Sequence, residues 1–150
     1  MKKRRVSSPA VPEPPPQTWS NGLVVGNQVF IAGMTARSGA ETVGGDSMYG
    51  QSRAIFDKIR HLMEAAGGRM DDIVKVVIYV TDIKRREEVW KARREVFSGD
   101  FPVSTLVEVR ALAAPELLVE VEAIAVLGAG GSQATKARRR PARSPARRRR

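Results

Sequence analysis

The run IVKVVIYV at residues 73–80 constrains the fold of this chain more than any other feature. Its β-branched residues favour an extended strand. Because successive residues of a strand point to opposite faces, every second residue from Val74 to Val80 would share one face, and Val77 and Tyr79 would lie on the other. Both faces are apolar, so we expect each of them to be at least partly covered. The fold therefore needs a sheet that packs against something on both sides.

Two amphipathic helices can cover one side of that sheet. Within residues 48–66, apolar residues recur at spacings of four and three, which is the pattern of a helix that buries one stripe. Asp46 or Ser47 can cap this helix, and Gly67 and Gly68 can end it. A second helix is predicted over residues 85–98, before Gly99. The two stripes consist of Ile55, Ile59, Leu62 and Ala66, and of Val89, Ala92, Val96 and Phe97.

The other apolar segments predict strands around these helices. Gly26 and Asn27 can form the turn of a hairpin, and the Gly-rich residues 35–46 predict a loop. The additional strands are expected at residues 23–25, 28–33, 104–112 and 117–126. The order ββαβαββ predicts an α+β sandwich in which two helices lie on one face of a mixed sheet. Since the outward face is still rich in Val, Leu and Ile, we expect the subunits of a homo-oligomer to meet there.

The charge of the chain is concentrated at its ends. The net charge is +10, from 26 Lys and Arg against 16 Asp and Glu, but the basic residues gather at residues 2–5 and 136–150, and the part between them is slightly acidic. This pattern predicts an extended, Pro-rich basic arm over residues 1–17, a folded domain over 18–128 and a disordered Arg-rich tail over 129–150.

The composition also narrows the chemistry. The chain has no Cys and a single His, His61, which rules out disulfides, thiolate chemistry and a His-rich metal site. We therefore expect no metal and no cofactor. Prolines follow the basic start where a signal peptide needs an apolar stretch, and no apolar run reaches the roughly 20 residues of a membrane helix. We expect a cytoplasmic protein without a membrane partner.

Three carboxylates interrupt the strands near the end of the predicted domain. Glu108 lies in STLVEVRAL, and Glu120 and Glu122 lie in LVEVEAIAV. A strand that is buried on one face exposes every second residue, so all three could simply be solvated. Alternatively, one of them faces a pocket. The period of the strand alone does not decide between these interpretations.

Four blocks of the sequence resemble a known family. The blocks IVKVVIYVTDI, REVF, FPVSTLVEVRAL and LLVEVEAIAV are similar to the signature blocks of the Rid (YjgF) family, and the resemblance spans residues 19–127. It implies a chorismate-mutase-like fold and a homotrimer with a ligand cleft between each pair of subunits. Many members are enamine/imine deaminases, which hydrolyse reactive 2-imino acids to 2-oxo acids and ammonia. Some were first described as translation inhibitors or endoribonucleases.

The resemblance also implies a set of site residues. Glu120 matches the glutamate that positions the attacking water, and Gly33, which follows Ala32, matches a glycine that donates its backbone N–H. Trp19 matches an aromatic residue at the mouth of the cleft, and Trp90 matches an asparagine of the deaminases. We therefore predict a small-molecule cleft built on these residues, with Glu120 as its catalytic group.

One position departs from the family pattern. Active deaminases carry an arginine where this chain has Ser104, followed by a small hydroxyl residue, here Thr105. A guanidinium grips a carboxylate through two parallel hydrogen bonds, which serine cannot do. The carboxylate of an imino acid would need backbone N–H groups, the hydroxyls of these two residues, or a cation such as Arg110 or Arg37. We expect weak activity on the usual imines, or an uncharged or aromatic ligand.

Two other functions compete with the deaminase. The missing arginine favours a noncatalytic trimer that binds a small ligand or acts as a chaperone. The basic tail favours a nucleic-acid-associated protein, in which the tail binds phosphates without reading sequence, since no aromatic residues interrupt it. The tail residues predicted to do so are Arg138, Arg139, Arg140, Arg147, Arg148, Arg149 and Arg150.

Overall fold

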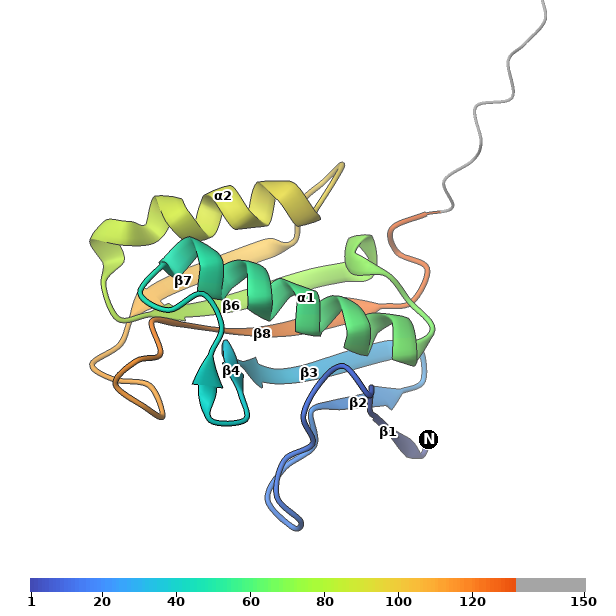
Figure 1. Ribbon diagram of the computed structural model, residues 1–150. Helices are drawn as coiled ribbons and strands as arrows, with labels where there is room; N and C mark the ends of the chain where they lie inside the picture. Colours follow the sequence, from blue (N-terminus) through green and yellow to red (C-terminus); the bar gives the residue numbers. More distant parts are fainter. Residues whose placement is uncertain (132–150) are drawn as a thin grey trace, which may run out of the picture.

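A computed structural model describes residues 1–131 and shows an α+β sandwich (Figure 1). Its sheet has six strands in the order β1-β2-β3-β8-β6-β7. Strands β6 and β7 are parallel, and the other neighbours are antiparallel, which makes the sheet mixed as predicted. The strands are β1 (Lys3–Val6), β2 (Gly22–Val25), β3 (Gln28–Met34), β6 (Ile73–Val80), β7 (Val103–Glu108) and β8 (Val119–Val126).

Both helices lie on the same face of this sheet (Figure 1). Helix α1 (Met48–Ala66) begins at Ser47, whose hydroxyl oxygen accepts a hydrogen bond from the N–H of Gly50 at 2.9 Å. It ends at Gly67, whose positive φ of 92° suits a residue without a side chain. The predicted stripe is buried, and α1 packs against β3, β8 and α2.

Helix α2 (Arg86–Val96) is shorter than the predicted 85–98. Residues Ile83–Arg85 form a separate 3-10 turn, which the carboxylate of Asp82 caps. At the other end Phe97 adopts an extended backbone and its ring meets Phe56 edge to face, with 5.8 Å between the ring centres. The helix therefore ends before the last turn that the apolar pattern indicated, and Phe97 packs against α1 through its ring.

The N-terminal segment corrects one expectation. Residues 1–17 were predicted to be an extended arm outside the folded domain, but β1 pairs with β2 at the edge of the sheet. Val6 and Val11 are buried in the core. Val6 approaches closely because the residue opposite it is Gly22, where an added Cβ would lie 3.2 Å from the Cβ of Val6. A single valine among basic residues forms no periodic pattern, so this pairing depends on the free edge of β2.

Several other boundaries also differ from the predictions. The predicted Gly-rich loop contains a second, two-stranded sheet of β4 (Arg37–Ser38) and β5 (Glu41–Thr42). A register shift near the start of β6 turns Val74 outward and buries Ile73 in its place. Residues 129 and 130, assigned to the disordered tail, form part of a turn, and the carboxylate of Asp72 accepts from the N–H of Gly130 at 2.9 Å.

The core lies between the helices and the inner face of the sheet. Strand β8 shows the division most clearly, since Val119, Val121, Ala123 and Ala125 are buried while the residues between them are half-buried. The outer face bears no helix, and Phe30, Val103 and Val107 on it are exposed. The carboxylates of β8 therefore lie on the face that the helices leave open.

Candidate functional site

A bulge in β3 shapes the backbone that lies next to Glu120. The register of β3 against β8 pairs Ile31 with Ala123 but Met34 with Val121, so β3 holds one extra residue between them. Such a bulge takes backbone groups out of the regular ladder and re-aims side chains. It places Ala32 and Gly33 at the outer face of the sheet, beside the carboxylate of β8.

The carboxylate of Glu120 rests directly on Gly33. A Cβ added to Gly33 would lie 2.0 Å from Oε1 of Glu120 and 2.9 Å from its Cδ. Any side chain at position 33 would therefore displace the carboxylate. On the other side Glu120 lies opposite Tyr79 of β6. A glycine is required here because of a close approach, not because of an unusual backbone angle.

A pocket of about 420 Å³ opens in front of this carboxylate. Four of the predicted site residues line it together, namely Trp19, Ala32, Gly33 and Glu120. The rest of the lining consists of Thr35, Arg37, Ala113 and Leu117. Trp19 is 55% exposed, so its ring forms an open wall of the pocket. The lining is mainly apolar with a few polar groups, which is the usual character of a small-molecule site.

The environment of Glu120 changes its acidity. Partial burial, and then the negative charge of Glu122, raise the pKa of Glu120 above the usual range of a glutamate. Burial, together with the charges of Glu122 and Glu120, also raises the pKa of Tyr79. A carboxylate that holds its proton more tightly is a better general base once it is ionised.

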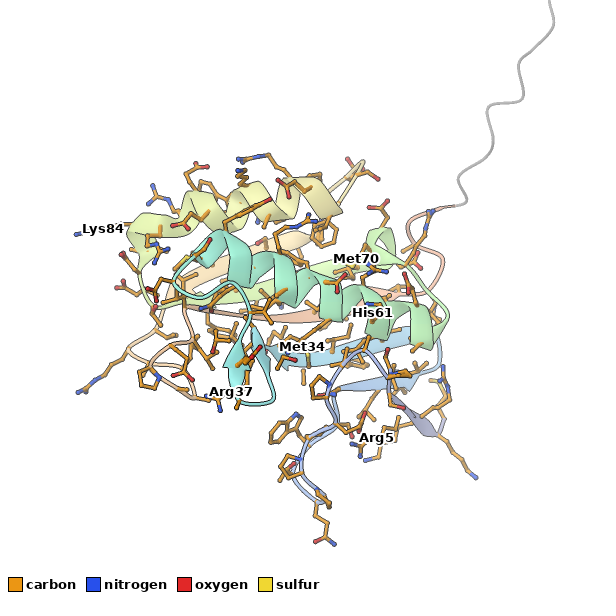
Figure 2. All side chains as sticks on the ribbon, in the orientation of Figure 1. Arg5, Met34, Arg37, His61, Met70 and Lys84 are labelled. Atoms are coloured by element: carbon orange, nitrogen blue, oxygen red, sulfur yellow. The ribbon has the colours of Figure 1, made fainter. Side chains whose placement is uncertain are left out.

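A network of hydrogen bonds fixes the outer wall of the pocket. The guanidinium Nη2 of Arg37 lies 2.6 Å from the carboxylate of Glu116, which joins the β4–β5 hairpin to the loop before β8. The buried Gln51 of α1 holds the same loop, because its Nε2 donates to the carbonyl of Glu116 at 2.8 Å and its Oε1 accepts from the N–H of Leu118 at 2.9 Å. Lys58 donates to the carbonyls of Thr35 and Arg37. Figure 2 shows Arg37 on that hairpin.

The remaining predicted site residues do not join this pocket. Ser104 pairs with the buried Val76, so it faces the helices, where Nη1 of Arg93 donates to its hydroxyl at 2.8 Å. Trp90 lies on α2 near the same arginine, whose guanidinium is 6.0 Å from the centre of the ring. Thr105 lies on the outer face two strands away from β8. Within one chain, the predicted set is therefore divided between the two faces of the sheet.

The other two carboxylates have separate surroundings. Glu108 accepts a hydrogen bond from the N–H of Ile83 at 3.1 Å, which is a structural contact. Glu122 and Lys75 line a shallow depression on the outer face together with Phe30. Of the three carboxylates, only Glu120 lines the pocket with Trp19 and Gly33.

Sequence reasoning overlooked the residues that support the pocket. Thr35, Glu116 and Gln51 carry no motif, and Leu117 and Ala113 belong to a segment read as a strand end and a linker. Only the buried glutamine on the apolar stripe of α1 could have indicated a polar partner nearby.

Residues 1–131 contain no group of three or more acidic or His side chains that could hold a metal ion, and no helix among them is long and apolar enough to cross a membrane. The tail arginines lie outside the described residues.

Comparison with known proteins identifies the family. The sequence pattern of the family described as endoribonuclease L-PSP matches residues 11–127, which is more than half of the chain. A solved structure described as a member of the YjgF/YER057c/UK114 family, from Mycobacterium tuberculosis, is 32% identical with a TM-score of 0.69, and the match covers 84% of this chain and 100% of that one. The chain belongs to the Rid (YjgF) family.

Two curated relatives illustrate the range of the Rid family. A RutC family protein of Pyrococcus horikoshii is 34% identical over 110 residues, which cover 71% of this chain and 85% of the relative. A protein of Dermatophagoides farinae named 2-iminobutanoate/2-iminopropanoate deaminase is 29% identical over 128 residues, which cover 83% of this chain and 97% of that one. The resemblance seen in the four sequence blocks is thereby confirmed at the level of the family.

Proposed function

We propose that this chain is an enamine/imine deaminase that hydrolyses reactive imines to carbonyl compounds and ammonia. The observation that carries the proposal is the carboxylate of Glu120, half-buried on Gly33 at the base of a pocket with an aromatic wall. The deaminase name of the Dermatophagoides farinae relative supports the same reaction. Hydrolysis of an imine is an easy reaction, so correct placement of one water and one base can suffice.

The proposed mechanism uses Glu120 as the group that moves each proton. The ionised carboxylate takes a proton from water as the water oxygen bonds to the imine carbon and the C=N π electrons move to nitrogen. The resulting carbinolamine receives that proton on its nitrogen. Glu120 then takes the proton of the hydroxyl group and passes it to the nitrogen as the C–N bond breaks, so that the carbonyl forms and ammonia leaves. The neighbouring apolar walls keep the carboxylate partly desolvated, which raises its basicity.

Release of ammonia and 2-oxo acid from an imine made in situ tests the proposal. We expect the natural chain to hydrolyse the imine faster than the uncatalysed reaction. In Glu120→Gln this enzymatic rate should fall at least about a hundredfold. Glu122→Gln is the matched control at a pH well above the pKa of Glu120, because it lies two residues away on the same face of β8 but lines a different depression. A natural chain without turnover would favour the noncatalytic ligand-binding or chaperone-like function instead.

We further propose that the chain works as a cytoplasmic homotrimer. The resemblance implies three subunits, and the exposed Phe30, Val103 and Val107 on the outer face support contact between copies. Such contact would bring Thr105, which lies on that face, nearer to the Glu120 pocket of another copy. Sedimentation equilibrium tests this, and a monomer at working concentration would contradict it.

Binding of RNA is a second candidate, which the charge distribution favours. The basic residues of 136–150 and the endoribonuclease description of the family both point to phosphate contacts. We expect the full chain to bind single-stranded RNA with an affinity that falls steeply with salt, and a chain that ends at Gly131 to bind far less. Unchanged affinity in the shortened chain would exclude the tail as the binding element.

A further inference from the structure

The pocket around Glu120 contains a single cationic side chain. Of the described residues that line it, only Glu120 and Arg37 are ionisable, and the rest are apolar residues, glycine and Thr35. The pocket that adjoins it shares Trp19, Gly33, Thr35 and Arg37 and adds Lys58. Lys58 lines only the adjoining pocket, so Arg37 is the cation that a ligand beside Glu120 meets.

Arg37 is also held in place with donors to spare. Its backbone carbonyl is tied to α1 through Lys58, and its Nη2 contacts Glu116 at 2.6 Å. A guanidinium has five N–H donors in a planar fork, and this ion pair occupies one side of it. The side chain is 47% exposed, which leaves the other donors accessible. An exposed ion pair of this kind is weak, because solvent screens it, so an anionic ligand can compete with Glu116.

We infer that Arg37 binds the negative group of the substrate in the Glu120 pocket, so that the substrate is a small anionic imine and not an uncharged one. The inference rests on the proposed function, because the same pocket would have to hold the imine. It assigns to a hairpin residue the carboxylate grip that Ser104, which faces the helices, cannot provide.

The charges in the pocket would orient an anionic ligand. An anion that enters beside Glu120 meets the charge of that carboxylate and of Glu122 nearby. Attraction to Arg37 turns the negative end of the ligand away from Glu120 and leaves the imine carbon toward the base. The guanidinium can hold a carboxylate through two parallel hydrogen bonds, which fixes direction as well as distance.

Two other arginines could act in its place, and the structure separates them. Arg93 contacts Ser104 on the helix side of the sheet. Arg110 lines a depression that shares only Ala113 and Leu117 with the Glu120 pocket. Both therefore serve as matched control positions for substitution.

The test measures binding of 2-oxobutanoate, a stable carboxylate, by isothermal titration calorimetry, with 2-butanone as the uncharged analogue. We expect Arg37→Gln to weaken 2-oxobutanoate binding at least tenfold, Arg37→Lys to restore part of it, and Glu116→Gln to tighten it. Arg93→Gln and Arg110→Gln should bind as the natural chain does, and thermal melting should show that every variant is folded. The affinity for 2-butanone should be the same in all of them.

The outcomes also distinguish the inference from the proposed function. The inference is overturned if the natural chain does not bind 2-oxobutanoate, if Arg37→Gln binds it equally well, or if Arg93→Gln or Arg110→Gln loses binding instead. Binding that depends on Arg37 without any turnover of imine would refute the deaminase and keep the anion site. Turnover of imines with no effect of Arg37→Gln on KM would keep the deaminase and refute the role of Arg37.

Discussion

Replacement of Gly33 by Ala isolates the contact on which the proposed site depends. The new Cβ would lie 2.0 Å from Oε1 of Glu120, and all three of its nearest atoms belong to that side chain. To reach an ordinary contact of at least 3.4 Å, Oε1 has to move by roughly 1.4 Å. A shift of about 1 Å in a catalytic group can cost on the order of a hundredfold in rate. We therefore expect kcat/KM for imine hydrolysis to fall by about that factor.

The same change should leave the fold almost as stable as before. A side chain can rotate out of the way at a cost of about 0.5–1.5 kcal/mol. Alanine has less conformational freedom than glycine in the unfolded chain, which stabilises the folded state by about 0.5–1 kcal/mol. This gain applies at Gly33 because its φ is not positive and alanine fits the backbone. The net change in the free energy of unfolding is within about 1 kcal/mol, which corresponds to a shift of about 2–4 °C in Tm.

Two comparisons make the experiment decisive. Gly22→Ala is the matched control, because its Cβ would press on Val6 at the far edge of the sheet and should affect melting without affecting turnover. Adding Gly33→Ala to Glu120→Ala should cause no further loss, since the displaced group is already gone. Full activity in Gly33→Ala, or a loss of several kcal/mol in stability, would refute the reasoning.

Further predictions concern acidity and packing. Glu122→Gln removes a charge that raises the pKa of Glu120, so the acidic limb of the kcat/KM profile should move to lower pH; an unmoved limb would contradict this. Because the pKa of Glu120 is raised on folding, its stabilising effect is present below the pKa of the unfolded chain and is lost as pH rises through the folded value. Glu120→Gln should therefore melt higher than the natural chain at neutral pH. Gln51→Ala leaves two carbonyls and one N–H without partners and should cost about 2–4 kcal/mol in urea unfolding, whereas the exposed Gln28→Ala should cost almost nothing. Val6→Ala should cost about 1.5–2.5 kcal/mol; a loss below about 0.5 kcal/mol would mean that β1 is not packed in solution.

Local patterns were sufficient for most of the architecture. The stripe of α1 and the caps at Ser47 and Gly67 appear in the structure as the spacing indicated, because these signals act within one or two helical turns. The ends of α2 and β7 were predicted too long. At Phe97 the contact with Phe56 overrides the local preference, and such a contact is not encoded in neighbouring residues.

The candidate site could be predicted only in part. Glu120 and Gly33 were placed together by the family resemblance, and the structure brings them into contact. Ser104 and Trp90 were assigned to the same cleft, but in a single chain they lie on the helix side of the sheet. The parity of a strand predicts which residues share a face, but it does not predict which face looks toward a pocket.

What the sequence determined by itself is the inventory: two amphipathic helices, the alternating strands, the basic ends and the carboxylates within β8. Only the tertiary structure decided which of these carboxylates meets a glycine, that β1 pairs at the edge of the sheet, and that Arg37 lines the same pocket as Glu120. The physical reason is the sequence separation over which the two kinds of contact act. Helix and strand periodicity arise from residues a few positions apart, whereas a pocket is made by segments that only the bulge in β3, the hairpin of β4 and β5 and the loop before β8 bring together.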